Sequence, residues 1–191
     1  MRQRLLDATI DCLVEHGYAG TTVTKIADRA GVTRGAQVHH YRTKAELVTA
    51  AIEHLANRLA EQTFADLSRL ESSEDLIGDA LEMIWQVHQG PVFAASVELW
   101  VAARTDPSLR DHVARLETTT IASLVDSGRK RLGAIADRPK YRHVVYTAMD
   151  VVRGILITSW AHPNADQLNA RWRRAKERLR IMIEASLDRP S

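Results

Sequence analysis

Side chains that can donate hydrogen bonds to nucleobases and phosphates are gathered in one short segment of the chain. Arg34 carries a guanidinium group that can donate two hydrogen bonds to the O6 and N7 atoms of guanine. His39 and His40 follow it and can donate to a phosphate or to the N7 atom of a purine. Gly35 and Ala36 are small, so they let the backbone approach a groove of the duplex closely. The chemistry that this segment predicts is recognition of double-stranded DNA.

Two short helices joined by a glycine turn are predicted to position these side chains. The first helix carries one apolar stripe at i, i+3, i+4 and i+7, formed by Val23, Ile26, Ala27 and Ala30. Gly31 can adopt the left-handed conformation that ends a helix, and Thr33 can cap the next helix, which begins at Arg34. This geometry presents the second helix to the major groove of DNA. An ordinary helical hairpin has the same spacing and is the alternative.

The residues of this segment, with the lead-in His16-Gly17-Tyr18, lie at the spacing of a known family. They are Thr22-Val23, Ile26-Ala27, Ala30-Gly31-Val32-Thr33, Gly35, Tyr41, Lys44 and Leu47. The segment resembles the tetracycline-repressor (TetR) family of bacterial regulators over about residues 2–52. The resemblance implies an all-α fold, with a helix-turn-helix DNA-binding domain at residues 1–50 and a helical ligand-sensing and dimerisation domain at residues 51–191. It also implies a repressor that binds a palindromic operator as a homodimer and is released by a small-molecule effector.

The DNA contacts implied by this resemblance and by the helical wheel centre on Arg34 as the base reader. Lys44 begins the next helix, where its ammonium and the helix N-terminus both favour a phosphate. Thr22 and Thr24 are expected to add contacts from the other side of the groove. The full predicted set is Thr22, Thr24, Thr33, Arg34, Gly35, Ala36, His39, His40, Tyr41 and Lys44.

Two positions depart from the family pattern. Val38 stands where a tyrosine that reaches a phosphate is common, so that contact is expected to be missing. Gln37 stands where an apolar residue is usual. It is either a polar residue at the rim of the small core, packed beside Tyr41, or a residue turned toward the bases as a reader of adenine.

Composition excludes several classes of protein. The chain has 191 residues and a formal net charge of +2, too small an excess for a nonspecific nucleic-acid coat. No apolar run approaches the length of a membrane span, so a cytoplasmic protein without a membrane partner is expected. The single cysteine, Cys12, cannot form an internal disulfide. Adjacent His39 and His40 point about 100° apart on a helix and do not chelate one ion well, so neither metal nor cofactor is expected.

The remaining chain is expected to be helical, with about nine helices in all. Beyond the three N-terminal helices, they are predicted near residues 44–70, 74–89, 91–104, 107–132, 140–161 and 165–187. No segment alternates like a strand. No motif of nucleophilic, phosphate-binding or metal-dependent catalysis is found, so a helical enzyme that uses His88, Glu98 or His112 as acid and base is only a remote alternative.

Two apolar seams near the C-terminus are candidates for a dimer interface. One consists of Leu168, Trp172, Ala175, Leu179 and Met182, and the other of Val145, Ala148, Val152 and Ile155. Two helices from each subunit would make a four-helix bundle. The alternative is that both seams close the core of a single subunit.

All four tryptophans lie in the C-terminal part of the chain, which favours an apolar pocket between helices. The candidate ligand-binding residues are His88, Phe93, Trp100, Tyr146, Met149, Arg153 and Trp160. Glu98 and Arg104 are further polar candidates, or an ion pair. The effector expected from this composition is apolar or amphipathic, and a DNA-binding dimer without an effector is the alternative.

Overall fold

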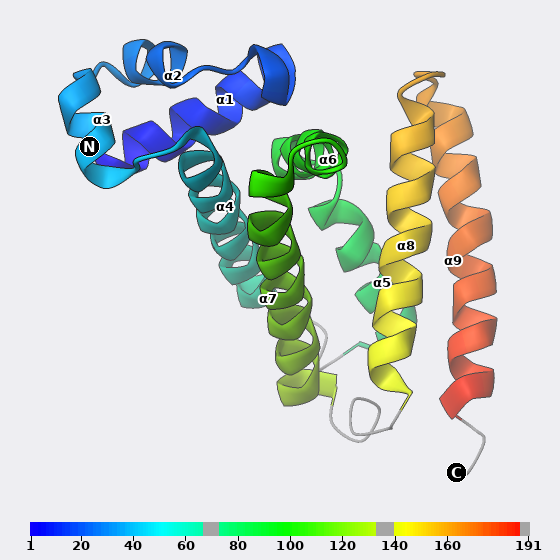
Figure 1. The fold of residues 1–191 in the computed structure, drawn as a ribbon. Coiled ribbons are helices and arrows are strands. Elements are labelled where there is room, and N and C mark those ends of the chain that lie inside the picture. The colour runs from blue at the N-terminus through cyan, green and yellow to red at the C-terminus, as the bar shows by residue number, and fades with distance from the viewer. Residues whose placement is uncertain (67–72, 133–139, 188–191) are drawn as a thin grey trace. The chain divides into compact units, whose positions relative to one another are not determined.

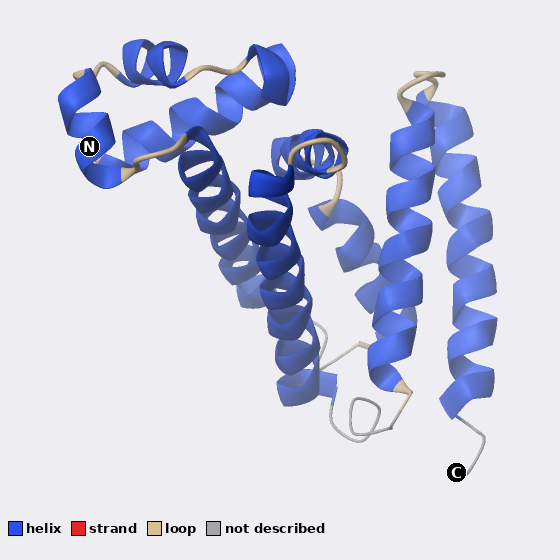
Figure 2. Ribbon diagram, viewed as in Figure 1, coloured by secondary structure: helices blue, strands red, loops and turns tan. Residues whose placement is uncertain are grey.

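The computed structural model describes residues 1–66, 73–132 and 140–187, and these residues form helices without strands (Figure 2). The helices are α1 (Arg2–Gly20), α2 (Val23–Ala30), α3 (Arg34–His40), α4 (Lys44–Asp66), α5 (Leu76–Val87), α6 (Pro91–Ala103), α7 (Pro107–Leu132), α8 (Tyr141–Ser159) and α9 (Ala165–Leu187) (Figure 1). The predicted all-α fold is confirmed, whereas the predicted end of the fourth helix near residue 70 lies outside the described residues. Nowhere in these three ranges is a helix both long enough and apolar enough to cross a membrane.

The chain packs as two compact units. An N-terminal unit contains residues 1–60 and 90–120, and a C-terminal unit contains residues 61–89 and 121–191. The expected domain boundary at residue 50 falls inside α4. Because α6 and the first half of α7 pack with the DNA-binding helices, the N-terminal unit is larger than the sequence indicates.

The core of the N-terminal unit joins α1 to the helices around it. α1 packs on both α2 and α6. Its apolar face supplies Leu5 and Leu13, which have no exposed surface. Further fully buried side chains in the same core are Ile26, Leu47, Val48, Ile52, Leu99 and Leu109. The stripe predicted for α2 is part of this core, since Ile26, Ala27 and Ala30 are buried.

A kink near the end of α1 brings a backbone N–H group against α6. Gly17 has φ 65° and ψ 177°, a conformation available almost only to glycine, and one further helical turn follows it. The N–H group of Tyr18 donates to Oε2 of Glu98 at 3.1 Å. Glu98, a candidate for orienting a ligand, therefore binds the end of α1 in the structure.

The C-terminal unit is built on pairwise packing of α5, α8 and α9, of which α8 and α9 lie side by side (Figure 1). The rings of Trp85 and Trp172 stack with centroids 4.7 Å apart and planes within 4° of parallel. Glu82 Oε2 accepts hydrogen bonds from Trp172 Nε1 at 3.1 Å and from Lys176 Nζ at 3.0 Å. An ion pair between Asp75 and Arg180 adds a further link to α9.

The two apolar seams proposed for a dimer interface lie largely inside the C-terminal unit. The buried seam positions are Val145, Ala148, Val152, Ile155, Trp172 and Leu179. Leu168 and Ala175 are half-buried, and Met182 is exposed. Because the buried side chains are already covered by the same chain, they are core positions of the subunit, which is the alternative that periodicity left open.

Candidate nucleic-acid interface

Capping residues begin and end the helices on either side of the turn between α2 and α3, as the sequence predicts. The hydroxyl of Thr22 accepts a hydrogen bond from the N–H group of Lys25 at 3.2 Å. Gly31 adopts the left-handed conformation at φ 63° and ψ 41° and ends α2. The hydroxyl of Thr33 then accepts from the N–H group of Ala36 at 3.3 Å, which starts α3. Thr22, Thr33 and the nearby Thr24 are all exposed.

One face of α3 is open to solvent and carries three of the predicted DNA-binding residues. Arg34, Gly35, Val38 and His39 are exposed along it, and His40 is exposed beside it. Ala36, by contrast, is half-buried. The outward residues combine a guanidinium, imidazole rings and an apolar side chain, which are groups that recognise the edges of bases.

Gln37 packs inward, which decides between the two interpretations of this position. Its side chain is 1% exposed. Nε2 donates to the carbonyl oxygen of Tyr41 at 2.6 Å, while Oε1 accepts no hydrogen bond from the described part of the chain. Gln37 therefore closes the end of α3 and does not face the bases.

Tyr41 also lies in the core, which corrects its place among the predicted DNA contacts. Its side chain is 7% exposed. The hydroxyl accepts a hydrogen bond from Nε of Arg2, at the start of α1, at 3.0 Å. Its role in the structure is to hold the end of α3 against α1.

Lys44 is engaged within the protein, unlike the predicted phosphate contact. Nζ donates to the carbonyl oxygen of Tyr18 at 2.6 Å and lies 3.8 Å from the centre of the Tyr18 ring. Burial lowers the pKa of Lys44. The sequence offers no signal for this contact, because the two residues are far apart in the chain and meet only through packing.

Replacing Lys44 with alanine is expected to lower the free energy of unfolding by about 2 kcal/mol, because a charge-assisted hydrogen bond and a contact with an aromatic face are lost together. Urea unfolding followed by circular dichroism measures this change. The exposed Arg42 offers a matched control, and Arg42→Ala is expected to leave stability unchanged. If Lys44→Ala instead left stability intact and lowered the salt dependence of DNA binding by about one phosphate per subunit, the lysine would be a DNA contact.

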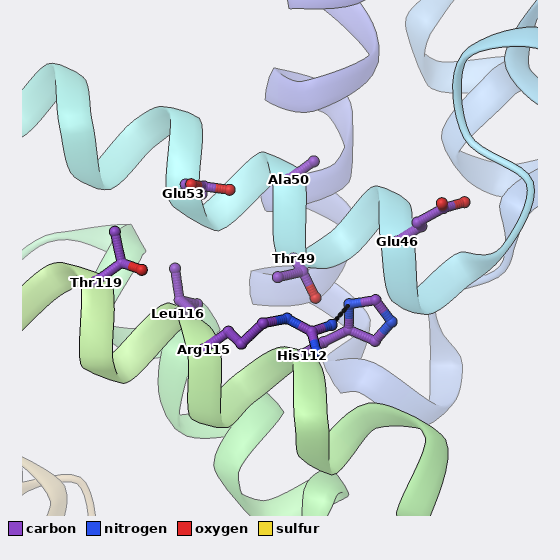
Figure 3. Close-up of a pocket in the computed structure, with 8 residues that line it drawn as sticks. All are labelled: Glu46, Thr49, Ala50, Glu53, His112, Arg115, Leu116 and Thr119. Carbon is purple, nitrogen blue, oxygen red and sulfur yellow. Dashed lines mark hydrogen bonds between the residues drawn. The ribbon is translucent and has the colours of Figure 1, made fainter.

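A groove of about 290 Å³ lies between α4 and α7 in the N-terminal unit (Figure 3). Its lining is mixed in polarity and comprises Glu46, Thr49, Ala50, Glu53, His112, Arg115, Leu116 and Thr119. Thr49 points toward Arg115 and His112, which lie 3.1 Å apart between Nη2 and Nδ1 (Figure 3). Glu46 Oε2 accepts from the N–H groups of Arg42 at 2.9 Å and Thr43 at 3.4 Å. Glu46 thus both lines the groove and binds the backbone that connects α3 to α4.

None of the predicted ligand-binding residues lines this groove. Phe93 and Trp100 belong to the N-terminal unit and make an edge-to-face contact at 6.1 Å. His88, Tyr146, Met149, Arg153 and Trp160 belong to the C-terminal unit, where Met149 is buried and Trp160 is 51% exposed. The groove-lining residues on each helix are spaced at i, i+3, i+4 and i+7, a signal that sequence reasoning missed because it followed the aromatic residues.

His88 is held neutral at the end of α5. Its Nδ1 lies 2.7 Å from the carbonyl oxygen of Ile84, to which it donates as the neutral tautomer. Burial lowers the pKa of His88 to about 4, and the positive charge of Arg153 acts in the same direction. Protonation of this ring is therefore more favourable in the unfolded chain than in the folded one.

Stability is expected to fall as pH decreases from 6.5 toward 4, because the unfolded chain binds a proton at His88 that the folded chain rejects. The loss from this group reaches about 2 kcal/mol at pH 5. Urea unfolding of wild type and His88→Gln across this range measures the effect. The variant is expected to lose less stability than wild type, and parallel curves for the two proteins would contradict the assignment.

The family described as bacterial regulatory proteins, tetR family, matches residues 5–51, which span α1 to α3 and the first part of α4. The HTH-type transcriptional regulator CymR of Pseudomonas putida is 30% identical, over 97% of this chain and 86% of that protein. The chain belongs to the TetR family. The HTH-type transcriptional repressor AcnR of Corynebacterium efficiens is 31% identical to this TetR-family regulator, over 68% of this chain and 69% of AcnR.

A solved structure supports the fold over the whole chain. The crystal structure of a transcriptional regulator from Rhodococcus sp. Rha1 superposes on it with a TM-score of 0.75, at 22% identity and with complete coverage of both chains. This likeness supports the all-α fold, while the family match and the named relatives make this TetR-family regulator a helix-turn-helix protein of transcription regulation.

Proposed function

We propose that this TetR-family regulator represses transcription by binding a palindromic operator as a homodimer. The observation that supports this proposal is the division of α3 into two faces. Gln37 and Tyr41 attach one face to the protein core, while Arg34 and His39 stand on the exposed face. Because α3 has only seven residues, one copy makes few base contacts, and two copies on successive half-sites supply the needed affinity.

The outer faces of α8 and α9 are the surface that we propose for dimerisation. Ile157, Ile181 and Met182 are large apolar side chains exposed at 37%, 51% and 36%. Gly154 is also exposed, with open space where a Cβ would lie, so a second helix can approach closely there. This surface replaces the buried seams as the interface, because apolar area that faces solvent in one subunit is what a second subunit can remove from water.

A small amphipathic effector is proposed to release the DNA by binding between α4 and α7. The groove there offers Ala50 and Leu116 as apolar contacts beside charged groups. A ligand that draws the carboxylate of Glu46 toward itself competes with the hydrogen bonds to Arg42 and Thr43 at the end of the recognition helix. Such a ligand acts through its different affinity for the two states, so operator DNA must weaken its binding by the same factor. A regulator without an effector is the alternative.

The test is selection of bound fragments from genomic DNA by the purified full-length protein, followed by footprinting and sedimentation. The proposal predicts a palindromic footprint bound by two subunits. A library of amphipathic compounds is then screened by thermal shift, since a ligand of the folded state raises the unfolding temperature. A compound that binds equally well with and without operator would remove the switch while leaving DNA binding intact. Monomeric protein on a non-palindromic site would remove the proposed repressor dimer.

A further inference from the structure

An apolar side chain stands on the DNA-facing surface of the recognition helix. Val38 is 46% exposed. It lies one helical turn after Arg34, with the exposed Gly35 and His39 beside it. Throughout residues 22–43, all of which the structure describes, it is the one large hydrophobic side chain so exposed.

The fold does not account for a valine at this position. The buried face of α3 is supplied by Gln37, whose amide binds the carbonyl oxygen of Tyr41. A β-branched residue also lowers helix propensity, and α3 is only seven residues long. Val38 therefore contributes nothing visible to the core or to the helix, and its surroundings on the exposed face suggest its role.

The major groove offers one apolar group for such a side chain, the C5-methyl group of thymine. At the same position cytosine carries only a hydrogen atom, and most other features of the base edges are hydrogen-bond donors or acceptors. Residues one turn apart on a helix are separated by about 5.4 Å along its axis. Since base pairs are spaced by about 3.4 Å, Arg34 and Val38 reach positions within about two base pairs of each other.

We infer that Val38 contacts the methyl group of a thymine in each half-site, within two base pairs of the guanine that Arg34 reads. This inference rests on the proposed binding of α3 in the major groove. The contact selects thymine by removing two apolar surfaces from water, whereas cytosine lacks the C5-methyl group and leaves the valine side chain without this apolar contact. Val38 thus determines specificity, at a position where a tyrosine that contacts a phosphate is common in the family.

The experiment begins with selection of a binding site from random duplex DNA by the full-length wild-type protein. Each thymine of the selected site is then replaced in turn by deoxyuridine, which lacks only the methyl group. At one thymine per half-site, replacement by deoxyuridine is expected to weaken wild-type binding by about fourfold, as the burial of one methyl group predicts. Replacement in both half-sites is expected to weaken it by about fifteenfold. Val38→Ala is expected to bind the thymine and deoxyuridine sites equally well.

Val14→Ala is the matched control, because Val14 on α1 is 50% exposed. This variant is expected to keep the thymine dependence of wild type. Thermal unfolding of both variants checks that neither loses its fold. The inference is overturned if no thymine within two base pairs of the guanine is sensitive, or if Val38→Ala keeps the same sensitivity. Failure of wild type to select any sequence is a different result, which overturns the proposed function and this contact with it.

Discussion

Arg34→Ala is expected to remove most of the sequence specificity of DNA binding, with a loss of affinity of about 100-fold to 1,000-fold for the operator. A bidentate pair with guanine contributes about 1 to 3 kcal/mol, and a symmetric dimer loses two such pairs at once. Arg34 is exposed in the first turn of α3 and is presented by the cap at Thr33. Fluorescence anisotropy with the selected operator and with an unrelated duplex measures specific and nonspecific affinity separately.

Arg34→Ala is expected to lower the affinity for the operator much more than the affinity for the unrelated duplex. Specific binding is expected to fall toward the level of nonspecific binding, because only the phosphate contacts of the dimer and the proposed thymine contact of Val38 remain. Arg110→Ala provides the control, since it removes the same charge from an exposed position on α7. Equal losses on both duplexes, or a loss of the same size in Arg110→Ala, would mean that Arg34 contributes only general electrostatic attraction.

Gly17→Ala is expected to lower the free energy of unfolding by about 3 kcal/mol, because two costs add. A residue with a side chain is strained by about 1 to 3 kcal/mol in this backbone conformation. A Cβ at this position would also lie 2.7 Å from Oε2 of Glu98, so the carboxylate must move and its hydrogen bond to Tyr18 is weakened. Urea unfolding of the DNA-free protein measures the change.

A second variant separates the two costs. Glu98→Ala removes the carboxylate that the new Cβ would meet, so the effect of Gly17→Ala in that background reports backbone strain alone. Gly35→Ala is the control for glycine replacement, because it has open space at its Cβ and is expected to stabilise the helix by up to about 1 kcal/mol. If Gly17→Ala lowered the free energy of unfolding no more than Gly35→Ala does, the kink would be released without cost.

The recognition unit could be predicted from the sequence because its signals are local. Thr22, Gly31 and Thr33 act within three or four residues of themselves, so the ends of α2 and α3 follow from residue type and spacing. The exposed position of Arg34 follows in the same way from the helical wheel. The TetR family itself is confirmed by comparison with known proteins.

The contacts that the sequence missed join residues that meet only through tertiary packing. Lys44 binds a carbonyl oxygen 26 residues away, and Glu98 binds an N–H group 80 residues away. Periodicity also cannot tell which surface covers an apolar seam. Trp172 fits a dimer seam by spacing, yet it stacks on Trp85 of the same subunit. For the same reason the groove between α4 and α7 became visible only when two helices were placed together.

The hydrogen bonds to the backbone of Tyr18 limit where a chimeric regulator can be joined. Glu98 of α6 binds the N–H group of Tyr18, and Lys44 of α4 binds its carbonyl oxygen. A hybrid protein joined at residue 50 would keep Tyr18 and Lys44 but replace the helix that carries Glu98. A transplantable DNA-reading module must instead carry residues 1–60 together with residues 90–120. Such a transplant therefore requires three junctions within the chain, near residues 60, 90 and 120, and the groove between α4 and α7 moves with the module.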